Sequence, residues 1–216
     1  MKVDFAYAEE DIYRHFVELF DEQVSHLRRI IFGKGTQAEN NNGSYYFIPN
    51  SSYRVIRDFI KIKRELRKSE HWRNKYYKEG GVSFLDAGCG IGNILVLALN
   101  SCLCQKATGL EYFPETLKLG RKFLKTYYSY ISENATIKKA DILKYKKYGD
   151  YDIIYFYRPF SDTEKERLFE KRIRDQMKVG SILIPYGNDT IFTQRDNRFK
   201  KTGLGSYFLF YTKVKE

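Results

Sequence analysis

Hydrophobic side chains recur at steps of three and four over the first 80 residues, which is the spacing of one face of an α-helix. This spacing predicts a first helix over about residues 9–32, which ends where glycines follow. A second helix is predicted from a cap at Ser51 or Ser52 to about residue 78. The apolar positions are Ile12, Phe16, Leu19, Phe20, Val24, Leu27 and Ile31 in the first helix and Val55, Ile56, Phe59, Ile60, Ile62 and Leu66 in the second.

From residue 82 onward, short apolar runs alternate with helical segments. The runs predict buried strands at residues 82–86, 106–111, 135–138, 151–157 and 181–185. Helices are predicted between them at residues 93–99, from Pro114 to about 130 and at 162–178. The end of the chain is predicted to be a hairpin of residues 191–194 and 207–213, with no helix before it. This alternation is typical of right-handed βαβ units, so we expect an α/β fold with a mostly parallel sheet.

The first predicted strand runs into a glycine-rich segment, FLDAGCGIGN, which spans Phe84 to Asn93. Glycine lets the backbone turn sharply and lets a ligand approach it, and ligands of open α/β sheets bind beyond the carboxyl ends of the strands. The spacing G-x-G-x-G followed by Asn93 departs from the dinucleotide pattern G-x-G-x-x-G. Asp86, directly before the loop, would repel a diphosphate but suits a ligand with an ammonium group.

Two further acids follow predicted strands. Glu111 ends the second strand, where a carboxylate can accept hydrogen bonds from both ribose hydroxyls. Asp141 follows the third strand, where it can accept from the exocyclic amine of adenine. Amine, ribose and adenine in this order describe S-adenosylmethionine, which is the expected cofactor. The alternatives are a tight turn that binds no ligand and, for Asp141, a loop or capping acid.

With these motifs, residues 82–160 resemble the class I S-adenosylmethionine-dependent methyltransferases. FLDAGCGIGN stands as the first motif, GLE as the second and KKAD as the third, and the resemblance covers roughly residues 50–214. It implies a Rossmann-like, seven-stranded sheet with flanking helices and the last strand antiparallel, after an N-terminal helical extension. The implied cofactor-binding residues are Asp86, Ala87, Gly88, Cys89, Gly90, Gly92, Asn93, Glu111, Tyr112, Asp141 and Ile142.

The end of the fourth strand is similar to that of small methyltransferases without a SET domain, which include protein-lysine methyltransferases and bacterial relatives. Their F-N-P-F segment appears here as Tyr157-Arg158-Pro159-Phe160, and these four are the implied catalytic residues. Their Y-x-P-T element appears as Phe47-Ile48-Pro49-Asn50, with its Tyr and Thr replaced. The Asn/Asp-Pro-Pro-aromatic segment of the adenine-amino methyltransferases is missing.

The resemblance implies methyl transfer by direct displacement, and we expect a protein amine, a lysine, as the acceptor. The alternatives are an RNA methyltransferase that uses basic faces and a non-catalytic binding protein with the same fold. Residues 1–80 are expected to form N-terminal helices and a substrate-side lid loop, and residues 81–216 the cofactor-binding domain. The aromatic segment Tyr45–Phe47 is expected to cover the cofactor or to pack the N-terminal helices on the sheet.

The composition adds a charge argument. The 216 residues carry a net charge of +11, with ten bases against four acids in residues 53–79 and nine against two in residues 118–147. Two interpretations of these segments stay open. They are a contact surface for an anionic partner such as RNA, or they are solvated lysine-rich faces. No apolar run of membrane-spanning length or signal peptide stands out, and three cysteines are too few for a disulfide framework, so we expect a cytoplasmic protein. No metal site is expected, and the oligomeric state is open.

Overall fold

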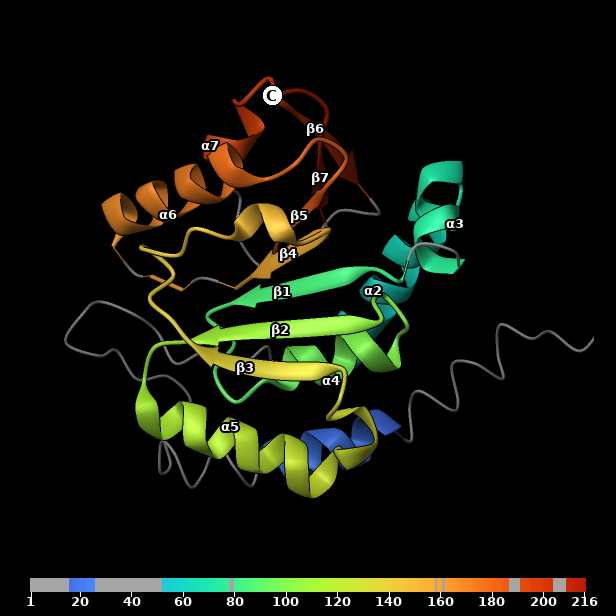
Figure 1. Ribbon diagram of the computed structural model, residues 1–216, viewed down its shortest axis with the longest axis vertical. Helices are drawn as coiled ribbons and strands as arrows, with labels where there is room; N and C mark the ends of the chain where they lie inside the picture. The colour runs from blue at the N-terminus through green and yellow to red at the C-terminus, as the bar shows by residue number, and fades with distance from the viewer. Residues whose placement is uncertain are drawn as a thin grey trace, which may run out of the picture.

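The computed structural model describes residues 16–25, 52–77, 80–157, 159–160, 162–186, 191–203 and 209–216. Within this part of the chain, seven strands form one sheet in the order β3-β2-β1-β4-β5-β7-β6 (Figure 1). The strands are β1 Ser83–Ala87, β2 Lys106–Glu111, β3 Ala135–Lys139, β4 Ile153–Phe156, β5 Ile182–Pro185, β6 Phe199–Gly203 and β7 Leu209–Lys213. The first five are parallel, and β7 is antiparallel to both of its neighbours. The Rossmann-like, mostly parallel sheet predicted from the sequence is therefore confirmed.

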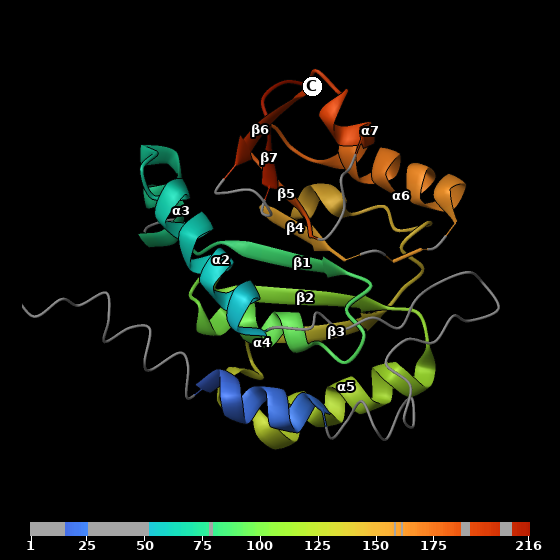
Figure 2. The same cartoon turned by 180° about the vertical axis from the view of Figure 1, so that it is seen from behind.

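Helices cover both faces of this sheet, as Figures 1 and 2 show from opposite sides. The helices are α2 Ser52–Leu66, α3 Glu70–Tyr77, α4 Asn93–Asn100, α5 Pro114–Tyr127, α6 Thr163–Gln176 and α7 Ile191–Gln194, with short 3-10 turns at Ser129–Ile131 and Tyr148–Asp150. One buried cluster joins α2, α4 and α5 to the sheet, and a second joins α6 to the other face. Phe84 points into the first cluster and Leu85 into the second, because successive side chains of a strand alternate between faces. Asp86 therefore shares the face of Phe84.

The predicted first helix is seen over residues 16–25, the described part of its range. Phe20 is fully buried and packs edge-on against Phe123 of α5 and against Tyr128, with ring centroids 6.4 and 5.9 Å away. Val17 is buried, whereas Leu19 is 49% exposed, so the prediction that Leu19 belongs to the apolar face is wrong. The Ser52 hydroxyl donates to Asp21, which ties this helix to α2.

The second predicted helix is two helices, α2 and α3, separated by a turn at residues 67–69. Trp72 and Tyr76 are buried, and they do not continue the spacing of Phe59, Ile62 and Leu66. The chain must therefore change direction to bury both aromatic rings. The Tyr76 hydroxyl donates to the Leu103 carbonyl at 2.8 Å, which holds α3 against the amino end of the sheet.

The predicted hairpin is also corrected. Residues 191–194 form α7, and the strand that pairs with β7 is β6, so a short helix does precede the hairpin. The helical turn is stabilised by α6: Arg174 donates to the Phe192 carbonyl at 2.8 Å, and the buried Thr193 hydroxyl donates to Glu170 at 3.2 Å. These contacts lie 18 and 23 residues apart in sequence, so no local pattern predicts them.

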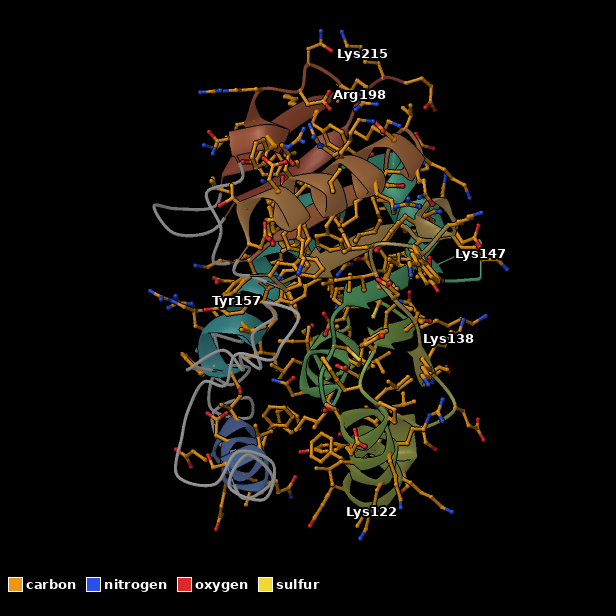
Figure 3. All side chains as sticks on the ribbon, turned by 90° about the vertical axis from the view of Figure 1, so that its left-hand side faces the viewer. Lys122, Lys138, Lys147, Tyr157, Arg198 and Lys215 are labelled. Atoms are coloured by element: carbon orange, nitrogen blue, oxygen red, sulfur yellow. The ribbon has the colours of Figure 1, made fainter. Side chains whose placement is uncertain are left out.

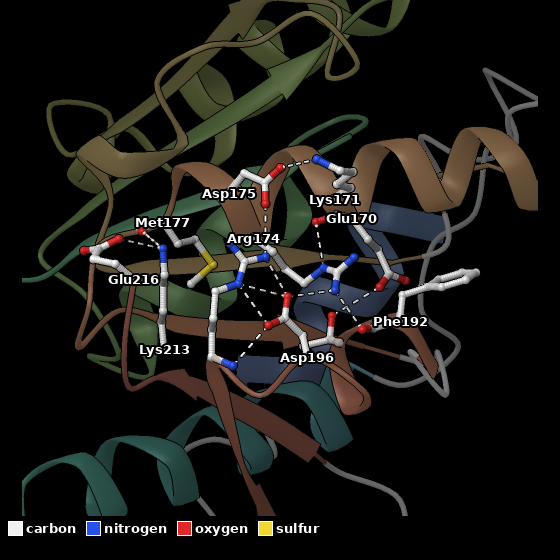
Figure 4. Close-up of polar contacts among 11 residues, drawn as sticks. Glu170, Lys171, Arg174, Asp175, Met177, Phe192, Asp196, Lys213 and Glu216 are labelled. Atoms are coloured by element: carbon white, nitrogen blue, oxygen red, sulfur yellow. Dashed lines mark hydrogen bonds and ion pairs between the residues drawn. The ribbon is translucent and has the colours of Figure 1, made fainter.

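Arg174 belongs to a charged network between α6 and the segment after α7 (Figure 4). Its guanidinium lies 3.0 Å from Asp196, which also pairs with Arg198 at 2.6 Å. Nearby, the buried Lys213 ammonium donates to the Met177 carbonyl at 2.7 Å. This network fixes the end of the sheet opposite to β3. Among the described helices, none has the length and apolar character needed to cross a membrane.

Candidate cofactor and substrate site

The carboxyl end of β1 places a buried acid before the glycine loop, which we define as residues 88–92. Asp86 is 2% exposed, and burial raises the pKa of its carboxyl well above the ordinary value. The Glu111 carboxyl raises this pKa further. Within the described residues, no hydrogen bond or ion pair reaches the Asp86 carboxyl. A buried carboxyl in this environment gains from a cationic ligand.

The glycine loop turns through left-handed backbone conformations, with φ of 93° at Gly88, 56° at Gly90 and 82° at Gly92. A Cβ atom at Gly92 would lie 2.8 Å from the end of the Ile137 side chain of β3, so a larger residue there would have to displace Ile137 in addition to adopting the strained φ. At Gly90 a Cβ atom would meet nothing within 4 Å. The backbone of Gly90 thus borders open space at the carboxyl ends of β1 and β2.

Glu111 closes the end of β2 and faces the same loop. Its side chain is mostly buried, and the Phe113 N–H donates to Oε1 at 2.8 Å. Burial raises the pKa of Glu111, and hydrogen bonds from the backbone N–H groups of Phe113, Tyr112 and Gly90 oppose that rise. The loop and the end of β2 therefore hold the carboxylate in one orientation.

Asp141 follows β3 and is 30% exposed. Its Oδ1 accepts from the Leu143 N–H at 2.9 Å, and its Oδ2 lies 3.6 Å from the Lys144 ammonium. The carboxylate closes a local turn, as the capping alternative predicts. The carbonyl of the half-buried Ile142 accepts from the Tyr148 hydroxyl at 2.8 Å, which fixes the loop that carries Asp141.

The other predicted cofactor residues near this edge of the sheet differ in the exposure of their side chains. Ala87, Cys89 and Asn93 are all buried. The Cys89 side chain packs against Gly109, which has no room for a Cβ atom. Tyr112 is half exposed, and its ring lies edge-on to Phe113 at 5.3 Å.

The residues after β4 separate into two directions. Tyr157 is half-buried on the side of α2, and its ring lies 5.8 Å from Tyr186, directly after β5 (Figure 3). The Pro159 ring lies 3.6 Å from where a Gly88 Cβ would stand, so it borders the glycine loop. Phe160 instead packs against Phe169 of α6, at 5.8 Å in the second buried cluster. Arg158 and the segment Tyr45–Pro49 lie outside the described residues.

Sequence reasoning overlooked two residues near this edge, Asp58 and Tyr186. Asp58 is 5% exposed on α2, and the Tyr186 hydroxyl donates to its Oδ2 at 3.5 Å. A signal was available for Asp58, because it lies three residues after Val55 and four before Ile62 on an otherwise apolar face. Tyr186 carried no such signal, since it follows a strand in a segment without a motif.

No family model matches the chain, and no curated protein is significantly similar to it. Solved structures do match. An RNA methyltransferase from Salinibacter ruber, in complex with S-adenosyl-L-homocysteine, aligns with a TM-score of 0.53 and 14% identity over 78% of this chain and 94% of that protein. A candidate methylase from Haemophilus influenzae aligns with a TM-score of 0.51 and 17% identity over 71% and 89%. By strand order, helix placement and these alignments, the chain has the fold of the class I S-adenosylmethionine-dependent methyltransferases.

Proposed function

We propose that this protein is an S-adenosylmethionine-dependent methyltransferase that acts on a protein amine, a lysine side chain. The observation that carries the cofactor is a pair of buried carboxyls, Asp86 and Glu111, next to a glycine loop with open space at Gly90. The Salinibacter neighbour was crystallised with the demethylated form of this cofactor, which supports the same assignment.

The chain offers one group for each part of the cofactor. Asp86 would accept hydrogen bonds from the ammonium of the methionine part. The positive charge of this ammonium would lower the pKa of the Asp86 carboxyl, which burial raises. Glu111, held by backbone N–H groups, would accept from the ribose hydroxyls. Asp141 would accept from the adenine amine, with its orientation fixed by the Leu143 N–H.

When bound, S-adenosylmethionine supplies a sulfonium methyl group whose bond to sulfur breaks as the bond to the acceptor nitrogen forms. The leaving sulfur keeps the electron pair as a neutral thioether, so the protein need not supply an acid. The residues of this chain must instead position a deprotonated amine in line and exclude water. Pro159 borders the glycine loop, and the ring of Tyr157, two residues earlier, lies beside Tyr186. Aromatic rings suit an amine and its cation, so the acceptor would enter on this side.

A direct test is calorimetry with S-adenosylmethionine and S-adenosylhomocysteine. We expect binding at micromolar level that Glu111→Ala weakens at least tenfold, since the variant loses both ribose hydrogen bonds. Glu115→Ala, an exposed acid in the first turn of α5, is the matched control and should bind normally. Absence of binding to the unmodified protein would contradict the proposed function.

RNA is the second candidate acceptor, and two observations favour it. Exposed lysines gather on α5, β3 and the following loop, among them Lys122, Lys138 and Lys147 (Figure 3). The Salinibacter neighbour is described as an RNA methyltransferase. Transfer of a radiolabelled methyl group to a bacterial extract, split by protease and by ribonuclease, decides between the acceptors. Label that survives protease but not ribonuclease, with RNA affinity that falls steeply with salt, would support RNA.

The division into an N-terminal part and a cofactor-binding part belongs to the same proposal. Residues 1–80 would contribute the substrate side, and residues 81–216 the cofactor side. The packing of Phe59 in α2 against Phe84 of β1 and Tyr155 of β4, with ring centroids 5.9 and 5.8 Å away, gives the two parts a common core.

A further inference from the structure

Asp58 is a charged residue on the buried face of α2. It lies among the apolar side chains that pack this helix on the sheet, and it is 5% exposed. Its hydrogen bond from the Tyr186 hydroxyl, at 3.5 Å, is at the outer limit for such bonds. Arg54, Arg57 and Lys61 act on it electrostatically from the same helix, yet the described residues form no ion pair with it. A buried carboxylate with one long hydrogen bond has capacity for a stronger donor.

A second observation lies on the neighbouring strand. Tyr155 is fully buried, and its hydroxyl has no hydrogen-bond partner within the described part of the chain. Tyr155 is in register with Asp86 on the adjacent parallel strand, so the two side chains share a face. Asp86, Tyr186 and Tyr157 all act electrostatically on the Tyr155 hydroxyl, so these groups lie near one another.

The tyrosines connect Asp58 to the proposed cofactor site. The ring of Tyr186 lies 5.9 Å from Tyr155 and 5.8 Å from Tyr157. Phe59, next to Asp58, lies edge-on to Tyr155 at 5.8 Å. A continuous group thus runs from Asp86 through Tyr155 and Tyr186 to Asp58. Tyr157, which contacts Tyr186, also belongs to this group. Tyr157 and Tyr186 are half-buried and form the more exposed side of the group.

We propose that Asp58, Tyr157 and Tyr186 bind the acceptor amine, with Asp58 as the acceptor of its N–H groups, the half-buried rings of Tyr157 and Tyr186 beside its alkyl chain, and Tyr155 packed behind them. This inference rests on the proposed function and names the acceptor as a primary alkyl amine. A carboxylate forms strong, charge-assisted hydrogen bonds with the ammonium form. After the ammonium loses a proton to solvent, the carboxylate still accepts from the remaining N–H groups, which turns the nitrogen lone pair away from Asp58. The ring faces favour the cationic form on entry.

The test measures methyl transfer to two probes, poly-L-lysine and a ribonuclease-treated bacterial protein extract. Asp58→Asn keeps the size of the side chain but removes the charge, and we expect KM for poly-L-lysine to rise at least tenfold. The affinity for S-adenosylhomocysteine, measured by calorimetry, should stay within twofold. Glu65→Gln is the matched control, because Glu65 lies on the same helix with 33% of its side chain exposed. This control should change neither value.

Tyr186→Phe provides a second variant that removes only the hydroxyl at Asp58, in case Asp58→Asn does not fold. We expect it to raise KM severalfold and to lower the melting temperature by at most a few degrees, because the lost hydrogen bond is long. Equal KM values for the unmodified protein and for both variants would overturn the amine site while leaving methyl transfer intact. Transfer by the unmodified protein to purified bacterial RNA, added as a third probe, but to neither protein probe would overturn the amine site together with the lysine acceptor. Failure to bind S-adenosylhomocysteine would instead remove the proposed function itself.

Discussion

At the scale of single residues, the proposed site depends on a glycine, which has no side chain, and on two buried acids. Gly90 has a left-handed φ of 56° and open space where its Cβ would stand. The two acids next to the loop, Asp86 and Glu111, are buried, and burial raises the pKa of each carboxyl. A ligand can therefore contact the loop backbone and both carboxyls together.

We predict that Gly90→Ala weakens S-adenosylhomocysteine binding at least tenfold, because the methyl group fills the space beside the loop. The left-handed conformation should also cost about 1 kcal/mol of stability. Gly80→Ala is the control, since Gly80 has a φ of 78°, nothing within 4 Å of its Cβ position, and a place before β1. Calorimetry and thermal unfolding should show similar destabilisation in both variants and a binding defect in Gly90→Ala alone. Unchanged binding in Gly90→Ala would place the cofactor elsewhere.

At the scale of elements, α6 and α7 are joined through a buried acid. Glu170 is 1% exposed, and burial raises the pKa of its carboxyl to about 7, although Thr193 and Arg174 partly oppose that rise. The folded protein therefore holds a proton on Glu170 at a pH where the unfolded chain, with an ordinary pKa of 4.5, has lost it. The stability contributed by this proton is present at low pH and is lost as the pH rises toward 7.

The consequence is a pH dependence that one substitution removes. Glu170→Gln keeps an oxygen for the Thr193 hydroxyl and does not titrate. We predict that its stability relative to the unmodified protein rises by about 2–3 kcal/mol between pH 4.5 and pH 8. Urea unfolding across this range measures the difference. Glu164→Gln, on the same helix with 70% of its side chain exposed, should show no such trend. A pH-independent difference for Glu170→Gln would mean that Glu170 stays ionised in the folded state.

At the scale of the whole molecule, the glycine loop connects neighbouring strands of the sheet. The Gly88 and Cys89 N–H groups donate to the Leu110 carbonyl at 3.0 and 2.9 Å, and Gly92 packs on Ile137 of β3. The loop thus joins β1, β2 and β3 at the edge where the acids lie. Ligand binding at this edge must stabilise the folded chain as a unit, because the elements that form the edge are separated in the unfolded chain.

We therefore predict a rise in melting temperature with S-adenosylhomocysteine. At 100 times the Kd, binding adds about 2.7 kcal/mol, which corresponds to about 5–10 °C for a protein of this size. Thermal unfolding with increasing ligand checks this, and Glu111→Ala should lose most of the shift at the same concentrations. A melting temperature that does not respond to the ligand would argue against a site at this edge.

Much of the architecture followed from local patterns. The five predicted parallel strands all exist, with ends within two residues of their predicted positions. The reason is that buried strands and amphipathic helices have different periods, which neighbouring residues reveal. The break between α2 and α3 and the helix α7 were missed. Both depend on distant partners: Trp72 and Tyr76 turn the chain to reach the core, and Thr193 reaches Glu170 across 23 residues.

For the site, local patterns predicted the order of Asp86, the glycines and Glu111, because each follows a strand and parallel strands bring their carboxyl ends to one edge. The roles of Arg158 and Tyr45–Pro49 stay predictions. The packing of Phe160 on α6 and the contact of Asp58 with Tyr186, 128 residues later in the chain, became visible only in the folded structure. Strand order and helix packing determine such contacts. Asp58 and Tyr186 belong to no common sequence pattern, so their spacing along the chain does not predict that they meet.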